Sequence, residues 1–296
     1  MKYRIVAIPI KMSTQKSTLG ATHPRISFIL TLFILLFCVP QIQIDSEAQI
    51  TINKCTVCGR SVYNCDYKGN HPKDKETFTA NGIQFTMIRV EGGSYTMGAT
   101  SEQGSDAYGD EKPAHSVSVS TFYIGETEVT QVLWQAVMSS NPSYFKGSLH
   151  PVETVSWNDC QTFISKLSSL TGRNFRLPTE EEWEYAARGG NKSRHTKYSG
   201  SSDVGSVAWY DGNSGGQPHD VKTKQPNELG IYDMSGNVRE WTSSYWCNDY
   251  NSSVDTSYCV YRGGGWGNHA ELTRVSCRNY FTPSGSIDGL GLRLAL

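Results

Sequence analysis

The stretch Asn227-Glu228-Leu229-Gly230-Ile231-Tyr232-Asp233-Met234-Ser235-Gly236-Asn237-Val238-Arg239-Glu240-Trp241 decides the fold. Glycine, asparagine and acidic residues stand here between large apolar residues, a pattern typical of a tight loop around an ion or a buried turn. Three further blocks accompany it: Arg176-Leu177-Pro178-Thr179-Glu180-Glu181-Glu182-Trp183-Glu184-Tyr185, Arg262-Gly263-Gly264-Gly265-Trp266 and Gly289-Leu290-Gly291-Leu292-Arg293-Leu294.

In this order, the four blocks resemble the formylglycine-generating enzyme (sulfatase-modifying factor) family over roughly residues 85–296. The resemblance implies an α+β domain with an irregular C-type-lectin-like fold and little regular secondary structure. It also implies an oxidase that converts the active-site cysteine of a sulfatase into formylglycine. Whether this chain has that activity depends on the residues at the catalytic positions.

Composition and the N-terminal segment predict an exported globular protein. The 296 residues carry a net charge of −1, which gives no electrostatic case for nucleic-acid binding. The apolar run Ile26–Val39 is shorter than the roughly 20 residues of a membrane span and fits a secretory signal cleaved after Ala48. An uncleaved anchor and a lipoprotein attached at Cys38 are the alternatives. We therefore expect a secreted, periplasmic or cell-surface protein with no membrane span after cleavage.

The chain is predicted to divide into a signal peptide (1–48), a small cysteine-rich N-terminal module with a linker (49–82), and the main domain (83–296). Alternation of apolar residues predicts strands at 85–90, at 94–98 as its hairpin partner, and at 115–120. Helices are expected after the capping residues Thr130, Ser156 and Thr179. Few regular elements are expected from there to Asn251, followed by strands at 260–262, 274–278 and 290–295.

Oxygen donors in the 227–241 stretch suit a hard cation. In the resembling family this loop binds calcium, and the matching positions are the side chains of Asp233 and Glu240 with the carbonyls of Gly236 and Val238. The alternative is a glycine-stapled turn in which Glu240 forms a salt bridge. A second calcium site of some members would need an oxygen donor where Ala208 stands, so it is not expected here.

The catalytic positions depart from the family pattern. Its oxidase holds copper(I) between two thiolates five residues apart, just after the glycine-rich block, and the matching residues here are Asn268 and Thr273. Neither supplies the soft sulfur that a cuprous ion requires. Cys277 has Leu272 five residues before it, so a shifted alignment does not restore the pair, and Cys277 is predicted to be a core residue. Copper and the family's oxidation are therefore not expected.

The N-terminal cysteines admit two interpretations. Cys55, Cys58, Cys65 and His71 have the composition of a tetrahedral zinc site with three sulfurs and one nitrogen. Because exported chains meet an oxidising compartment, a disulfide is the alternative. Farther along, Cys247 and Cys259 flank a polar loop and are predicted to form a disulfide.

A cluster of aromatic and polar residues near the C-terminus suits a recognition surface. The leading hypothesis is a non-redox member that binds a protein, peptide or glycan; the alternative is the formylglycine-generating oxidase. A histidine-ligated iron oxidase ranks below both, because no facial triad can be assembled from the spacing. The candidate binding residues are Trp266, Asn268, His269, Glu271, Thr273, Arg278, Tyr280 and Phe281.

Overall fold

The computed structural model describes residues 42–44, 50–52 and 73–296. The chain divides into two compact units, residues 1–71 and 72–296. In the first unit, the described residues form one antiparallel pair of short strands, β1 (Ile42–Ile44) and β2 (Ile50–Ile52). The predicted cleavage after Ala48 and the predicted zinc or disulfide residues Cys55, Cys58, Cys65 and His71 lie outside the described residues, and both remain predictions.

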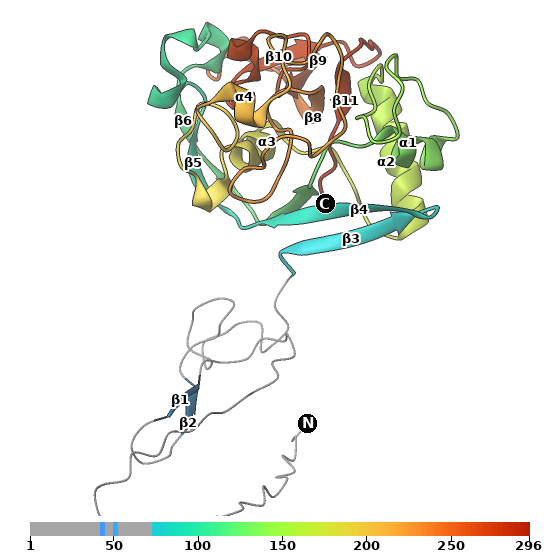
Figure 1. Ribbon diagram of the computed structural model, residues 1–296. Helices are drawn as coiled ribbons and strands as arrows, with labels where there is room; N and C mark the ends of the chain where they lie inside the picture. The colour runs from blue at the N-terminus through green and yellow to red at the C-terminus, as the bar shows by residue number, and fades with distance from the viewer. Residues whose placement is uncertain (1–41, 45–49, 53–72) are drawn as a thin grey trace, which may run out of the picture. The chain divides into compact units, whose positions relative to one another are not determined.

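The second unit has the irregular α+β fold that the sequence predicts (Figure 1). It contains a four-stranded sheet in the order β10-β9-β8-β11, a three-stranded sheet in the order β3-β4-β7, and the two-stranded sheet β5-β6. The strands are β3 (Lys75–Ala80), β4 (Ile83–Val90), β5 (Gly93–Met97), β6 (His115–Val119), β7 (Phe122–Gly125), β8 (Arg239–Trp246), β9 (Asp255–Arg262), β10 (Arg278–Phe281) and β11 (Leu290–Leu292). The helices are α1 (Gln131–Met138), α2 (Trp157–Thr171), α3 (Glu180–Ala187) and α4 (Val204–Val207).

The three longer helices begin where their capping residues predict. Thr130 accepts a hydrogen bond from the backbone N–H of Leu133, and Ser156 and Thr179 each form a reciprocal capping box. Helix α2 ends at Gly172, which adopts the left-handed conformation expected of a C-terminal glycine. Figure 1 shows α1 and α2 together on one side of the unit, while β5 and β6 lie on the opposite side. The helix predictions are confirmed.

One linker prediction and two strand predictions were wrong. Lys75–Ala80, expected as part of a linker, is strand β3, because burying Phe78 and Ala80 on one face gives it an apolar side. Strand β5 pairs with β6 and not with β4. The predicted strand at 274–278 is absent, and β10 begins only at Arg278, because Arg274 turns inward to pair with buried Glu111.

Strand β8 lies at the centre of the large sheet, although few regular elements were expected there. It pairs antiparallel with β9 and parallel with β11, with Leu290 opposite Arg239. Its first half is buried on both faces, since Glu240, Trp241 and Thr242 are consecutive buried residues. Such a strand lacks the polar–apolar alternation that reveals a half-exposed strand.

The last residues of the chain join separate parts of the domain. Ala295 forms isolated β-bridges with Ile124 and with Arg176. Leu296 and Tyr123 exchange two backbone hydrogen bonds of 3.1 and 2.9 Å. The C-terminal segment therefore holds β7, the chain entering α3 and the large sheet in one arrangement.

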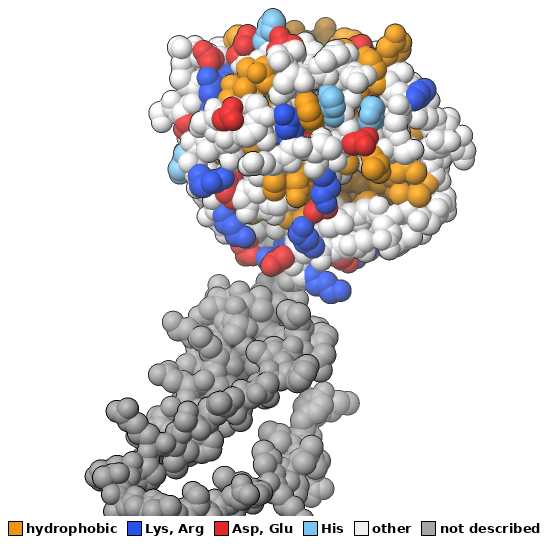
Figure 2. Space-filling model, in the orientation of Figure 1, with side chains coloured by type: hydrophobic (Ala, Val, Ile, Leu, Met, Phe, Trp, Pro, Cys, Tyr) orange, Lys and Arg blue, Asp and Glu red, His pale blue; other side chains and the backbone are white. Residues whose placement is uncertain are grey.

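Two apolar clusters fill the interior. One lies between α1, α2 and strands of both larger sheets, with the rings of Trp134 and Phe163 stacked 4.8 Å apart. The other surrounds α3 and includes Trp183 and Tyr185. Positive and negative side chains are mixed on the face seen in Figure 2. Within the described part of the chain, no helix has both the length and the apolar character needed to cross a bilayer.

Candidate functional site

A cavity of about 190 Å³ opens beside the glycine-rich loop that follows β9. Strands β8, β9 and β10 and the loop contribute its walls, so the segments predicted to carry the family's chemistry do meet. Gly264 lets the loop pack closely, because a Cβ there would lie 2.5 Å from the carbonyl oxygen of Leu272. The lining residues are Arg239, Tyr261, Arg262, Gly263, Gly264, Asn268, Leu272, Cys277, Arg278 and Asn279.

Two of the lining arginines belong to a buried ion network anchored on α3. Arg278 makes two hydrogen bonds of 2.7 Å to the carboxylate of Glu180. Arg262 pairs with Glu184 and, at 3.3 Å, with Glu180. Arg188 pairs with the other oxygen of Glu184, at 2.8 Å. These guanidinium groups are neutralised from within the domain and fix the rear of the cavity.

The side chains at the family's two sulfur positions form hydrogen bonds within their own loop. The Asn268 side-chain oxygen accepts a hydrogen bond of 2.9 Å from the backbone N–H of Gly265. Thr273 is fully buried, and its hydroxyl donates to the carbonyl of Ala270 at 2.9 Å. Each side chain therefore stabilises the turn that shapes the cavity. Within residues 73–296, no three or more His, Cys, Asp or Glu side chains are grouped so as to hold a metal ion.

Cys277 lines the cavity but is almost completely buried, as predicted for a core residue. Burial raises the pKa of its thiol to about 12. At pH 8 the reactive thiolate would then be only about one part in ten thousand. Cys277 is therefore a poor nucleophile in the folded protein.

Alkylation of the native protein tests this. With iodoacetamide at pH 8, Cys277 should stay unmodified, whereas half-buried Cys247 should react much faster. Peptide mass mapping would measure both sites in one sample, and urea should make both react. Equal labelling of Cys277 and Cys247 in the native protein would contradict the assigned burial and pKa.

The predicted disulfide between Cys247 and Cys259 is wrong, because both thiols are free. Across the β8–β9 ladder, Cys259 lies opposite Tyr245 and points into the apolar core. Cys247 follows the end of β8, and its sulfur lies 3.5 Å from a guanidinium nitrogen of Arg278. The two cysteines flank the loop in sequence but have different partners in space.

The predicted recognition residues do not form one exposed surface. Thr273 and Arg278 are buried, and both have the structural roles described above. His269 is exposed and pairs with Asp211, and Tyr280 is exposed on β10, where its ring packs against Trp246. The remaining predicted residues, Trp266, Asn268, Glu271 and Phe281, are half-buried. Of the predicted set, Asn268 and Arg278 line the cavity.

An acidic centre lies beneath the 227–241 stretch. Glu240 is fully buried and shared between Arg293, at 2.7 Å, and the indole N–H of Trp183, at 2.6 Å. Asp233 accepts a hydrogen bond from the backbone N–H of Lys222 at 2.8 Å, while its other oxygen, Oδ1, is buried without a partner in the described part of the chain. The salt bridge that was the alternative for Glu240 is thus present.

Glu128 belongs to this centre, although nothing in the sequence marked it. Its oxygens accept hydrogen bonds of 3.1 Å from the Val238 backbone N–H and from the Asn237 side chain. Burial raises its pKa well above the usual range, and the charges of Asp233 and Glu240 raise it further. Burial also raises the pKa of Asp233 to about 6. Glu128 lies 110 residues before Val238 in the sequence, which explains why local sequence patterns do not identify it.

The charges of this centre favour a cation. Three buried carboxylates, Glu128, Asp233 and Glu240, face the single guanidinium of Arg293. The unpartnered oxygen of Asp233 suits a hard cation such as calcium, whereas the oxygens of Glu240 are already engaged. The donor set therefore fits calcium through Asp233, but not through Glu240 in the arrangement seen here.

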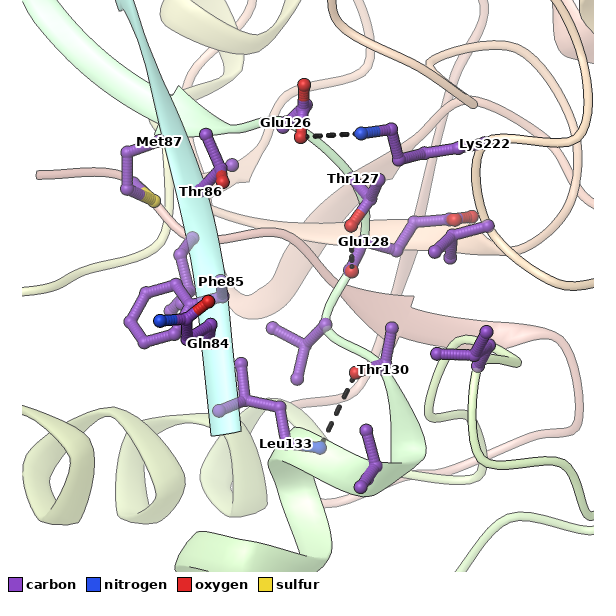
Figure 3. A pocket seen from close by; sticks show the side chains of 16 residues that line it. Gln84, Phe85, Thr86, Met87, Glu126, Thr127, Glu128, Thr130, Leu133 and Lys222 are labelled. Atoms are coloured by element: carbon purple, nitrogen blue, oxygen red, sulfur yellow. Dashed lines mark hydrogen bonds and ion pairs between the residues drawn. The ribbon is translucent and has the colours of Figure 1, made fainter. Parts of the chain in front are cut away.

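A second cavity, of about 240 Å³, is lined in part by Glu128 of this acidic centre. Figure 3 shows β4 forming one wall and the segment Glu126–Leu133 forming the opposite wall. Glu126 points toward Lys222 across the opening, at 2.8 Å, and also pairs with Lys75 at 2.9 Å. The cavity is lined by charged side chains, including Glu126 and Lys222, and by apolar side chains, including Leu133.

Comparison with known proteins identifies the family. Residues 73–296 match the family described as "Sulfatase-modifying factor enzyme 1-like domain". The "Chaperone protein LppX" of Paenibacillus barcinonensis is 34% identical over 261 residues, covering 70% of this chain and 88% of that protein. The "Formylglycine-generating enzyme" of Streptomyces coelicolor is 27% identical over 284 residues, covering 71% and 88%.

A solved structure gives the same assignment. "Treponema denticola variable protein 1" superposes with a TM-score of 0.67 at 33% identity, covering 76% of this chain and 99% of that one. The family match over residues 73–296 includes the glycine-rich blocks, the capped helices and the C-terminal strand. This chain belongs to the sulfatase-modifying factor, or formylglycine-generating enzyme, family.

Proposed function

We propose that the chain is an exported, non-redox member of its family that binds a protein, peptide or glycan ligand. The observation that carries this proposal is the state of the catalytic positions. Asn268 and Thr273 replace the two sulfurs and are hydrogen-bonded within their own turn. A cuprous ion needs soft sulfur ligands, and the one thiol at the cavity, Cys277, is buried and strongly protonated.

The family relationship supports binding as the retained property. A protein named as a chaperone is among the relatives, which is compatible with a binding function. In this chain the glycine-rich loop forms part of the cavity, which is backed by a buried ion network. A preformed cavity on a rigid scaffold is the arrangement expected of a recognition site.

An oxidation assay tests the proposal. The exported chain, loaded with copper in air, should form no aldehyde on a Cys-x-Pro-x-Arg peptide above the protein-free blank, because no pair of thiolates can hold copper(I). The Streptomyces coelicolor enzyme, assayed in parallel, is the positive control. Aldehyde formation, or binding of one copper equivalent that is lost in Cys277→Ser, would overturn the proposal.

Calcium is proposed as a structural ion of the acidic centre, with Asp233 and the carbonyls of Gly236 and Val238 as ligands. The unpartnered Asp233 oxygen supports it, as does the grouping of three buried carboxyl groups with one guanidinium, that of Arg293. When bound, calcium would favour the ionised forms of these carboxyl groups and hold a loop that has few ladder hydrogen bonds. Zinc in the N-terminal module remains a prediction from the sequence.

Thermal unfolding with and without calcium tests this assignment. At a calcium concentration about a hundred times the Kd, the ion should add about 2–3 kcal/mol, which raises the Tm by several degrees. Asp233→Asn keeps the side-chain shape but removes the charge, so the calcium increment should largely disappear. Magnesium serves as the control ion. A shift of equal size with magnesium, or in Asp233→Asn, would contradict the assignment.

A further inference from the structure

We infer that the cavity beside the glycine-rich loop binds a carboxylate group, held by Arg239. This inference rests on the proposed binding function and specifies the chemistry of the ligand. Arg239 begins β8, is half-buried, and lines the cavity. No carboxylate in the described part of the chain forms an ion pair with it. Its guanidinium carbon lies 5.9 Å from the centre of the Tyr261 ring.

The other charges around the cavity are balanced. Arg262 and Arg278 are paired with Glu180 and Glu184. Arg188, which bonds the second oxygen of Glu184, is also paired with Glu102, so three carboxylates balance three guanidinium groups. None of the residues lining the cavity is acidic. Arg239 therefore contributes an unneutralised positive charge to a partly desolvated space, where an anionic partner is favoured.

Uncharged donors point to the same chemistry. The oxygens of Asn268 and Asn279 accept hydrogen bonds from nearby backbone N–H groups, which leaves their NH₂ groups as donors at the cavity. Trp266 does not line the cavity, but close to the Arg239 guanidinium its indole N–H is buried without an acceptor in residues 73–296. A Cβ on Gly289 would lie 2.9 Å from that indole nitrogen and 3.6 Å from Arg239 Nη1, so the two donors flank the same glycine.

The size of the cavity limits what can enter. A volume of about 190 Å³ is below the range of roughly 300–1,000 Å³ typical of sites for whole small-molecule ligands. It suits a single side chain or a chain end. The geometry therefore favours a peptide that inserts one carboxylate, which Arg239 would bind through its planar fork of N–H donors.

Matched peptides test the inference by NMR titration of the full exported chain. Acetyl-Gly-Gly-Glu-Gly-amide should bind at least about tenfold more tightly than acetyl-Gly-Gly-Gln-Gly-amide, because a charged hydrogen-bonded pair is lost. Acetyl-Gly-Gly-Gly with a free carboxylate, compared with its amide, separates a chain terminus from an acidic side chain. Preference for either carboxylate form supports the inference.

Three variants assign the effect to the residue. Arg239→Gln should weaken the carboxylate peptide about tenfold and abolish the Glu-over-Gln preference, whereas Arg239→Lys should keep part of both. Arg194→Gln removes the same charge from an exposed pair with Glu228 outside the cavity and should change neither. Equal binding of Glu and Gln peptides, no binding at millimolar peptide, or an unchanged preference in folded Arg239→Gln would overturn the inference. None of these results involves copper, so failure here is distinct from failure of the non-redox proposal.

Discussion

Replacing Arg293 with Met should destabilise the domain by about 3–5 kcal/mol, because it leaves buried carboxylates without their counter-ion. Arg293 is fully buried, bonds Glu240 through two nitrogens, and also donates to the carbonyls of Gly125 and Tyr232. Since whole domains are stable by only about 5–15 kcal/mol, this loss would be a large fraction of the total. Urea unfolding followed by circular dichroism would measure it.

Arg176→Met is the matched control. Arg176 also makes two short hydrogen bonds to one carboxylate, that of Glu182, but its side chain is 41% exposed. A solvent-screened pair of this kind contributes about 1 kcal/mol or less. The double variant Glu240→Gln with Arg293→Met should recover part of the loss, while Glu128 and Asp233 account for the rest. Equal losses in the two single variants would show that the buried pair is not worth more than the exposed one.

Gly236→Ala should destabilise the domain by about 3 kcal/mol, because it combines a steric clash with backbone strain. Gly236 has a φ of +79°, and a Cβ there would lie 2.3 Å from the carbonyl oxygen of Trp209 and 2.9 Å from its nitrogen. Both opposing atoms are backbone atoms, so a change of rotamer cannot relieve the contact. The same urea measurement applies.

Gly215→Ala separates the two causes. Gly215 has a similar φ of +66°, but nothing lies within 4 Å of the added Cβ. Only the strain should remain, at about 1 kcal/mol. The difference between the variants then measures the close approach of the 227–241 loop to Trp209. A loss in Gly215→Ala as large as that in Gly236→Ala would contradict this close approach.

Local signals in the sequence predicted local structure well. Ser156 with Asp159 marks the start of α2, and Gly172 marks its end, because capping depends on residues a few positions apart. The glycine-rich blocks predicted the fold in a different way, through their resemblance to a known family, and the family match over residues 73–296 confirms it.

The errors concern partners that are distant in sequence. Glu128 meets Val238 across 110 positions, so no spacing rule reveals it. Cys247 and Cys259 flank one loop, but the ladder places Tyr245 opposite Cys259. The candidate cavity was only partly predicted: Asn268 was identified, but Arg239 was not, because only the structure shows that it lines the cavity and forms no ion pair within the described residues. These are properties of packing and charge balance in three dimensions.

The position of β11 has a consequence for how the protein is made. It inserts beside β8, and the residues after it bridge to Ile124 and Arg176. This part of the domain is the last to leave the ribosome, so the large sheet cannot be completed during synthesis of the preceding residues. Long-range pairing of this kind slows folding. During synthesis β8 can therefore pair with β9 first, whereas its other edge stays unpaired until Leu290–Leu292 has been made.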